Sequence, residues 1–155
     1  MWRSPEMESD LANLITVLNL DPLEADHASL IDISARSEWT LASTPTVESA
    51  LESLRVNRIP ILFCNSDLRP GLWQEMLDRM LSLPDPPFLV VTSRLADDRL
   101  WAEALNLGAY DVLAKPFDKT EVNRIVRSAW LRWTNRKPSA TALTSGLSAV
   151  RTATA

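Results

Sequence analysis

The chain has 155 residues, a formal charge of −4 at pH 7 and an isoelectric point near 5.0. The length suits one domain with tails, and the acidic balance argues against a nucleic-acid-binding protein, which usually carries a basic face and a high isoelectric point. Cys64 is the only cysteine, so neither a disulfide framework nor a thiolate metal site can form. No apolar stretch reaches the roughly 18–20 residues that span a bilayer, and no signal peptide is visible, so we expect a cytoplasmic protein without membrane contact.

Strand patterns and helix patterns alternate along the chain after residues 1–12, which are mostly polar and are predicted to form a flexible N-terminal segment. Short, nearly continuous apolar runs indicate buried strands. These runs span residues 13–22, 59–65, 86–93 and 110–117, and a further short strand, stopped by Pro45, is predicted over residues 40–44. Apolar residues at helical spacing indicate five helices. These helices span residues 24–39, 46–57, 72–83, 96–109 and 118–133.

Local signals support several of these helices. Thr46 and Asp118 are suited to be N-caps, and Gly108 is suited to be a C-cap. The apolar face of the first helix is expected to carry Ala28, Ile31 and Ala35. The last helix has a longer apolar stripe, made of Val122, Ile125, Val126, Ala129 and Trp133.

Buried strands that alternate with helices predict a parallel sheet with helices on both faces. We therefore predict one α/β domain over residues 13–133, a doubly wound sheet of five parallel strands. Residues 134–155 are rich in Ser, Thr and Ala and keep no apolar period, which predicts a disordered tail. In doubly wound sheets, ligands bind at the carboxyl ends of the strands.

The residues that close the predicted strands are polar and chemically complementary. They are Asp21 after the first strand, Asn65, Ser66 and Asp67 after the third, Thr92 and Ser93 after the fourth, and Lys115 with Pro116 after the fifth. Carboxylates at such an edge could hold Mg²⁺, and a lysine with a hydroxyl could bind phosphoryl oxygens. The alternative is a structural salt bridge from Lys115 to Asp21 or Asp67.

Two stretches of the sequence carry a resemblance to a known family. "LGAYDVLAKPF" followed by "DKTEVNRIV" resembles the last strand and helix of a response-regulator receiver domain, and "FLVVTSRLADD" resembles its fourth strand, with the switch hydroxyl at Thr92. The resemblance covers residues 14–133 and implies a flavodoxin-like fold. It also implies an aspartate at the end of the third strand that accepts a phosphoryl group from a histidine kinase, and an acidic pair after the first strand that holds Mg²⁺.

The sequence departs from the receiver pattern at three positions. The acidic pair is replaced by Asp21-Pro22, and the aromatic switch position falls on Val112. The acceptor position falls on Ser66 when counted from the flanking prolines, or on Asn65 when anchored on the apolar run. The remnants of a phosphoryl pocket are Asp21, Thr92, Lys115 and Pro116.

These departures favour a stand-alone, divergent receiver-like domain that is not an enzyme and needs no cofactor. We expect it to work by protein–protein interaction, with a histidine kinase or another signalling protein as partner or as a homodimer, and without ordinary aspartate phosphorylation. The alternative is a phosphorylatable response regulator in which Asp67 is the acceptor and Asp21 and Asp67 hold Mg²⁺. A flavodoxin-like enzyme or flavin carrier is disfavoured, because no phosphate-binding loop follows the first strand.

The chain has six tryptophans, which is many for its length. Trp39 and Trp73 are expected to pack beside the sheet. Trp101 and Trp130, on the last two helices, are candidates for a partner face, because aromatic residues are enriched in interface hot spots. His27, the only histidine, is expected to lie exposed on the first helix.

Overall fold

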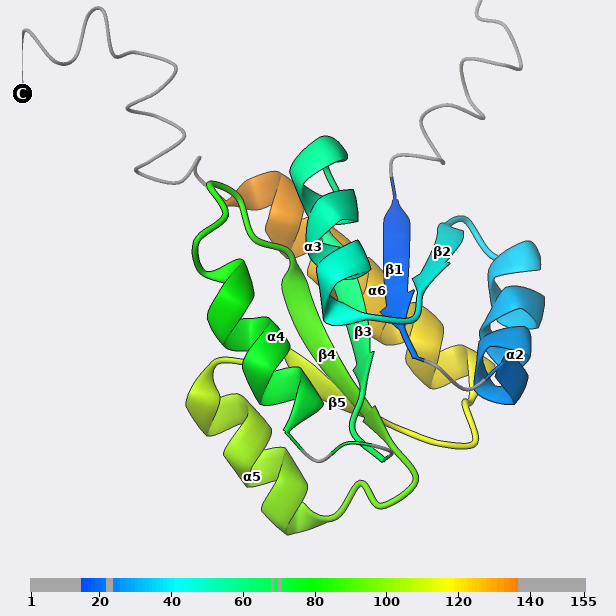
Figure 1. Cartoon of the computed structure of the whole chain (residues 1–155). Helices are drawn as coiled ribbons and strands as arrows, with labels where there is room; N and C mark the ends of the chain where they lie inside the picture. The colour runs from blue at the N-terminus through cyan, green and yellow to red at the C-terminus, as the bar shows by residue number, and fades with distance from the viewer. Residues whose placement is uncertain (1–14, 22–23, 68, 70, 137–155) are drawn as a thin grey trace, which may run out of the picture.

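The computed structural model describes residues 15–21, 24–67, 69 and 71–136 (Figure 1). The predicted flexible segment, residues 1–12, and residues 137–155 of the predicted tail lie outside the described residues. The described part contains the predicted alternation of strands and helices. The strands are β1 (Thr16–Leu20), β2 (Thr40–Thr44), β3 (Ile61–Asn65), β4 (Phe88–Ser93) and β5 (Asp111–Ala114). The helices are α2 (Glu24–Ala35), α3 (Val47–Val56), α4 (Leu72–Met80), α5 (Asp98–Leu107) and α6 (Lys119–Asn135).

The five strands form one parallel sheet in the order β2-β1-β3-β4-β5. The order reverses direction at β1, which is the switch point of a doubly wound sheet. All strands therefore end at the same edge, the lower edge in Figure 1. The predicted flavodoxin-like α/β fold is confirmed.

Helices cover the two faces of the sheet unequally (Figure 1). Helices α3, α4 and α5 lie on one face, and α2 and α6 lie on the other. Alternate strand residues point to the two faces, so Leu62 and Cys64 join the first core while Ile61 and Phe63 join the second. Burial raises the pKa of the Cys64 thiol far above its ordinary value, so this cysteine is a packed core residue and not a reactive thiol.

The predicted caps are confirmed. The Thr46 side chain accepts a hydrogen bond from Ser49 N, and the Asp118 side chain accepts one from Glu121 N. Gly108 closes α5 with φ of 109°, a left-handed conformation that favours glycine. Trp39 and Trp73 are buried beside the sheet as predicted.

Helix α6 runs two residues past the predicted domain boundary at Trp133. Arg136, its C-cap, lies 3.7 Å from the centroid of the Trp133 ring and forms an ion pair with Asp85. The stacked guanidinium and its ion pair fix this end of the helix against the loop before β4. The predicted start of the tail at residue 134 is therefore too early, because residues 134–136 belong to the helix end.

The predicted apolar face of α2 is wrong. Ala28, Ile31 and Ala35 are exposed. The helix instead buries Asp26, Leu30 and Ile33. The spacing of apolar residues could not reveal this face, because its first member is a carboxylate that is buried against cations from other elements.

The helix also ends earlier than predicted. Ser37 donates a hydrogen bond from its hydroxyl to Ile33 O, which satisfies a carbonyl of the last turn and closes α2 at Ala35.

Within the described residues, no helix is long and apolar enough to cross a membrane.

Candidate functional site

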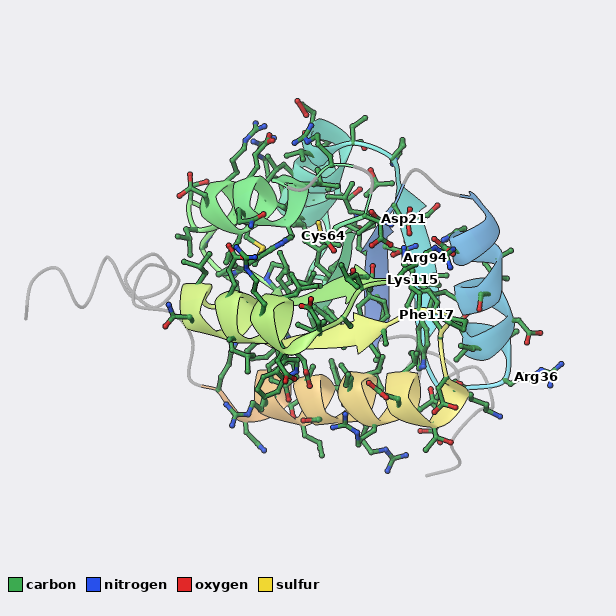
Figure 2. The ribbon with its side chains drawn as sticks, turned by 90° about the horizontal axis from the view of Figure 1, so that it is seen from below. Asp21, Arg36, Cys64, Arg94, Lys115 and Phe117 are labelled. Carbon is green, nitrogen blue, oxygen red and sulfur yellow. The ribbon has the colours of Figure 1, made fainter. Side chains whose placement is uncertain are left out.

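Polar side chains from four elements meet where the strands end. Figure 2 shows Asp21, Arg94 and Lys115 gathered near α2, with Phe117 beside them. Asp21 follows β1, and its backbone N–H donates to Thr44 O of the neighbouring strand at 3.2 Å. Lys115 follows β5, and its backbone N–H donates to Ser93 O at 2.9 Å. The sheet ladder therefore fixes the backbone from which both side chains project.

Lys115 is the centre of the site. Its side chain is fully buried, and its ammonium lies 3.2 Å from Asp21 Oδ2, 2.9 Å from Asp26 Oδ2 and 3.4 Å from Asp67 Oδ2. A buried ammonium costs free energy unless it is paired and hydrogen-bonded, and here three carboxylates surround it. The predicted salt bridge from Lys115 is present to both candidate carboxylates, and to a third that the sequence analysis did not propose.

The third carboxylate is Asp26, from the first turns of α2. It also accepts a hydrogen bond from Arg94 Nη2 at 2.6 Å. Asp26 thus bridges a cation from β5 and a cation from the loop after β4. The signal in the sequence is faint: Asp26 stands four residues before Leu30 and seven before Ile33, on the stripe that α2 buries.

Asn65 is the last residue of β3 and is completely buried. Its Nδ2 donates to Asp21 Oδ2 at 3.2 Å, and its Oδ1 accepts a hydrogen bond from Asp67 N at 2.8 Å. The amide therefore donates to one carboxylate and shapes the turn that positions another. Ser66 points elsewhere, since its hydroxyl donates to Thr92 O at 3.2 Å. Of the two candidate acceptor positions, only Asn65 contacts the pocket side chains.

Asp67 accepts hydrogen bonds from the loop after β4. Its Oδ1 accepts from Ser93 Oγ at 2.9 Å, and its two oxygens accept from Arg94 N at 3.0 and 3.1 Å. Burial raises the pKa of Asp67, but the hydrogen bonds from Ser93 and Arg94 N and the charge of Lys115 outweigh burial, so the pKa lies below its ordinary value. Asp67 is therefore an anion at neutral pH.

The hydroxyl that reaches the pocket comes from Ser93. Thr92, which the resemblance assigned as the switch hydroxyl, is completely buried, and its Oγ1 has no hydrogen-bond partner among the described residues. The two neighbours point to opposite faces of β4 because side chains alternate along a strand. The assignment of Thr92 to the pocket is therefore wrong by one residue. Val112, at the aromatic switch position, is buried in the core on the α3–α4–α5 face.

Pro116 and the tryptophans complete the list of predicted site residues. The peptide bond between Lys115 and Pro116 is cis, and Pro116 is exposed. Trp101 is 50% exposed on α5. Trp130 lies on the flank of α6 that faces Glu38 and Trp39. Ser128 lies on the other flank, where its hydroxyl is hydrogen-bonded to the hydroxyl of Tyr110, the residue before β5. Trp101 lies on α5 and Trp130 on the α2 side of α6, and their use as a partner face stays a prediction.

His27 is half-buried and not exposed as predicted. Asn19 of β1 lies beneath it, with Asn19 Nδ2 3.3 Å from His27 Nδ1. The contact gives the buried amide a partner and attaches α2 to the sheet. The histidine thus contributes to the packing of α2 on β1.

Known proteins resemble this chain in part of its sequence and in its fold. No family model matches the sequence. A stretch of 73 residues is 32% identical to a protein-glutamate methylesterase/protein-glutamine glutaminase of Desulfotalea psychrophila; it is 46% of this chain and 20% of that protein. The chain thus matches about a fifth of the length of this curated relative.

Solved structures match over most of the chain. The signal receiver domain of an HD domain-containing protein from Pseudomonas fluorescens is 21% identical, with a TM-score of 0.68 over 79% of this chain and 98% of that chain. A putative response regulator from Chloroflexus aurantiacus is 21% identical, with a TM-score of 0.69 over 76% and 98%. The fold is that of a response-regulator receiver domain. The resemblance seen in the sequence is therefore confirmed at the level of the fold.

A third structure shows a receiver domain with a partner. It is the receiver domain of a Saccharomyces cerevisiae response regulator, in complex with a histidine phosphotransfer protein. It is 14% identical, with a TM-score of 0.66 over 76% of this chain and 90% of that chain. These likenesses concern the fold, in which Asp21, Asn65 and Lys115 lie at the carboxyl ends of β1, β3 and β5.

Proposed function

We propose that the chain is a signalling domain of a two-component system that acts by protein–protein contact, without ordinary aspartate phosphorylation. The receiver fold supports the signalling role, and the yeast complex supports a signalling protein as the class of partner. The observation that carries the second half of the proposal is Asn65 at the end of β3. A carboxamide cannot form an acyl phosphate, and this one already donates to Asp21 and accepts from Asp67 N.

The pocket carboxylates do not fit the Mg²⁺ site that the resemblance implies. Asp21 Oδ2 and Asp67 Oδ2 both face the Lys115 ammonium, at 3.2 and 3.4 Å. Among the described residues, no group of three or more acidic, histidine or cysteine side chains is arranged to hold a metal ion. In our proposal the ammonium neutralises these carboxylates, and no step of the function passes through Mg²⁺.

The network also fixes the loop that leads to α5. Asp67 holds Arg94 N and Ser93 Oγ, and Asp26 holds the Arg94 guanidinium. These contacts connect the ends of β3 and β4 and the start of α2. The carboxylate of Asp67 already accepts hydrogen bonds from Ser93 Oγ and Arg94 N and pairs with the Lys115 ammonium. An external anion would have to displace this carboxylate to reach the same groups. We propose that the loop is therefore held in one arrangement at neutral pH.

The partner would contact the surface that follows this loop. Leu95 in the loop is 71% exposed, and Trp101 and Leu107 on α5 are 50% and 51% exposed. Exposed aromatic and large apolar side chains on a helix and its entry loop are candidates for contact with a partner. The proposed output surface is thus α5 with the loop before it.

The second candidate function is a working receiver in which Asp67 is the phosphoryl acceptor. One observation favours it: Asp67 is ionised, lies 3.4 Å from Lys115 Nζ and has a side chain that is 20% exposed. Phosphorylation would require one oxygen of Asp67 to give up its hydrogen bonds from Ser93 Oγ or Arg94 N. Asp67 also lies in the loop, two residues beyond the strand end.

The experiment that separates the two functions is treatment with acetyl phosphate and Mg²⁺, followed by intact-mass measurement. We expect no added mass of one phosphoryl group on the wild type. An adduct that is labile to hydroxylamine and absent from Asp67→Asn would establish the working receiver. An adduct that persists in Asp67→Asn would place the modification on another residue. The matched control is Asp78→Asn, which removes an exposed carboxylate of α4.

A further inference from the structure

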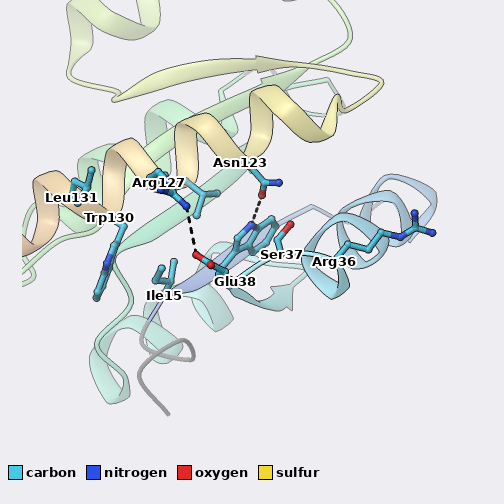
Figure 3. A pocket seen from close by; sticks show the side chains of 10 residues that line it. Ile15, Arg36, Ser37, Glu38, Asn123, Arg127, Trp130 and Leu131 are labelled. Atoms are coloured by element: carbon cyan, nitrogen blue, oxygen red, sulfur yellow. Dashed lines mark hydrogen bonds and ion pairs between the residues drawn. The ribbon is translucent and has the colours of Figure 1, made fainter. Parts of the chain in front are cut away.

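A groove of about 430 Å³ lies between the C-terminal end of α2 and α6 (Figure 3). Ile15 precedes β1 and Trp39 precedes β2, so the groove is at the amino ends of these strands, away from the Lys115 pocket. Its lining includes the apolar side chains of Trp39, Val126, Trp130 and Leu131 and the guanidinium groups of Arg36 and Arg127. The proposed function assigns it no role.

The floor of the groove is rigid and apolar. Trp39 is 6% exposed, and its Nε1 donates to Asn123 Oδ1 at 2.8 Å, which fixes the ring against α6. Val126 is buried beside it. Above this floor, Leu131 is 53% exposed and Trp130 is half-buried, so apolar surface is left for another molecule to cover.

The rim of the groove carries two guanidinium groups whose present partners hold them weakly. Arg127 lies 3.6 Å from Glu38, with the two side chains 74% and 78% exposed. Arg36 lies 3.5 Å from Asp32, with side chains 68% and 65% exposed. Exposed ion pairs of this kind contribute about 0–1 kcal/mol, so either guanidinium can be redirected to a partner at little cost.

The outer face of α6 is basic although the chain is acidic overall. The exposed cations of this helix are Lys119, Arg124, Arg127 and Arg132. Glu121, in its first turn, is the acidic side chain of the helix. The charge next to the groove is thus opposite in sign to the net charge of −4 of the whole chain. A partner that is complementary to this face is acidic.

We propose that the groove binds an acidic segment of a partner protein, with an apolar or aromatic side chain seated beside Trp130 and carboxylates directed to Arg36 and Arg127. Trp and Arg dominate interface hot spots, and here they frame an apolar floor that is already ordered. This inference does not depend on whether Asp67 is phosphorylated, because the groove is separate from the pocket and shares no residue with it.

The test is selection of random 12-residue peptides displayed on phage against the full chain, with affinities of the selected synthetic peptides measured by fluorescence anisotropy. We expect enrichment of Asp and Glu around one aromatic or aliphatic residue. Arg127→Glu and Trp130→Ala should each weaken binding about tenfold or more. The matched controls are Arg55→Glu and Val56→Ala, exposed residues of α3 that belong to neither proposed surface and should leave the affinity unchanged.

Three results would overturn the proposal. The first is a failure of the selection: no peptide binds saturably, or the selected peptides are neutral or basic, or they bind Arg127→Glu and Trp130→Ala as tightly as the wild type. The second is concentration-dependent self-association in sedimentation that Trp130→Ala abolishes, which would assign the groove to a second copy of the chain. The third is binding that appears only after deletion of residues 1–12, which would assign the groove to the chain's own N-terminal segment.

Discussion

Asn65 Nδ2 donates a hydrogen bond to Asp21 Oδ2 at 3.2 Å, across the carboxyl ends of two adjacent strands. A carboxylate at position 65 would stand against Asp21 and repel it, whereas the amide is a hydrogen-bond donor to it. The same Asp21 oxygen lies 3.2 Å from the Lys115 ammonium. An amide and an ammonium thus share one oxygen of Asp21, and this sharing defines the charge balance of the pocket.

The first prediction concerns this charge balance. Asn65→Asp removes the donor to Asp21 and adds a like charge beside it, so we expect a loss of about 1–3 kcal/mol in the free energy of unfolding at pH 7. Two adjacent carboxylates also create ligands for a hard cation. Millimolar Mg²⁺ should therefore restore part of the stability of Asn65→Asp and leave the wild type unchanged.

Urea unfolding with and without Mg²⁺ checks this prediction. Asn106→Asp, at an exposed position of α5, is the control for a surface charge change. A variant Asn65→Asp that is as stable as the wild type and indifferent to Mg²⁺ would mean that the amide is not needed in the pocket.

The second prediction concerns Lys115. Its side chain and that of Asp21 are 0% and 1% exposed, so Lys115→Met leaves buried carboxylates without their common cation. Breaking a buried ion pair by removing one partner costs about 3–5 kcal/mol. We expect a loss of this size in urea unfolding, and almost no loss for Lys119→Met at an exposed position.

A double change refines the test of Lys115. Lys115→Met combined with Asp21→Asn should be more stable than Lys115→Met alone, because one uncompensated charge is removed with the cation. If the double variant is less stable than the single one, the pair is not coupled in the way that the distances indicate.

The third prediction separates the two hydroxyls at the end of β4. Ser93 Oγ donates to Asp67 and accepts from Leu95 N, so Ser93→Ala should cost about 1 kcal/mol. Thr92 Oγ1 is buried without a partner among the described residues, so Thr92→Val should leave stability unchanged or raise it by about 1 kcal/mol. Thermal unfolding of both variants measures the two changes in stability. A larger loss for Thr92→Val than for Ser93→Ala would mean that Thr92, and not Ser93, is the pocket hydroxyl.

The fourth prediction is a pH dependence that arises from Asp67. Its folded-state pKa lies below its ordinary value of 3.8, which it regains when the chain unfolds. The stability that the ionised carboxylate contributes is therefore complete above about pH 4 and is lost as the pH falls through the folded-state pKa. Asp67→Asn should be about 1–2 kcal/mol less stable than the wild type at pH 7, and this gap should narrow below pH 4.

Urea unfolding of both proteins at pH 7 and at about pH 3 measures that gap. Asp78→Asn, at an exposed position of α4, should show no gap at either pH. A gap for Asp67→Asn that stays constant or widens in acid would contradict the lowered pKa.

The fold could be predicted from the sequence because four of its strands are nearly continuous apolar runs; β2, with the sequence TLAST, is the exception. β3 is buried at every position and the α6 stripe was assigned correctly. The face of α2 was missed for a physical reason. Asp26 is buried because Lys115 and Arg94 neutralise it, and these partners lie 89 and 68 residues away in sequence. A rule based on apolar spacing cannot recognise a buried carboxylate whose partners come from distant elements.

The pocket could be predicted only in outline. Strand ends placed Asp21, Lys115 and Asp67 near one another, and in the structure both carboxylates lie within salt-bridge distance of the Lys115 ammonium. The choice between Thr92 and Ser93 depends on strand parity, which reverses with a shift of one residue. The face of Trp130 depends in the same way on helical phase, since Ser128 two positions earlier lies on the other flank of α6.

The measurement that most directly tests the central claim is a titration of the full chain with Mg²⁺ and then beryllofluoride, a phosphoryl mimic, followed by two-dimensional amide NMR. The account predicts no saturable shift at Asp67, Ser93 or Lys115, with the spectrum of a folded protein throughout. Saturable shifts at these amides that need both ions and disappear in Asp67→Asn would contradict it, and would establish Asp67 as a phosphoryl acceptor.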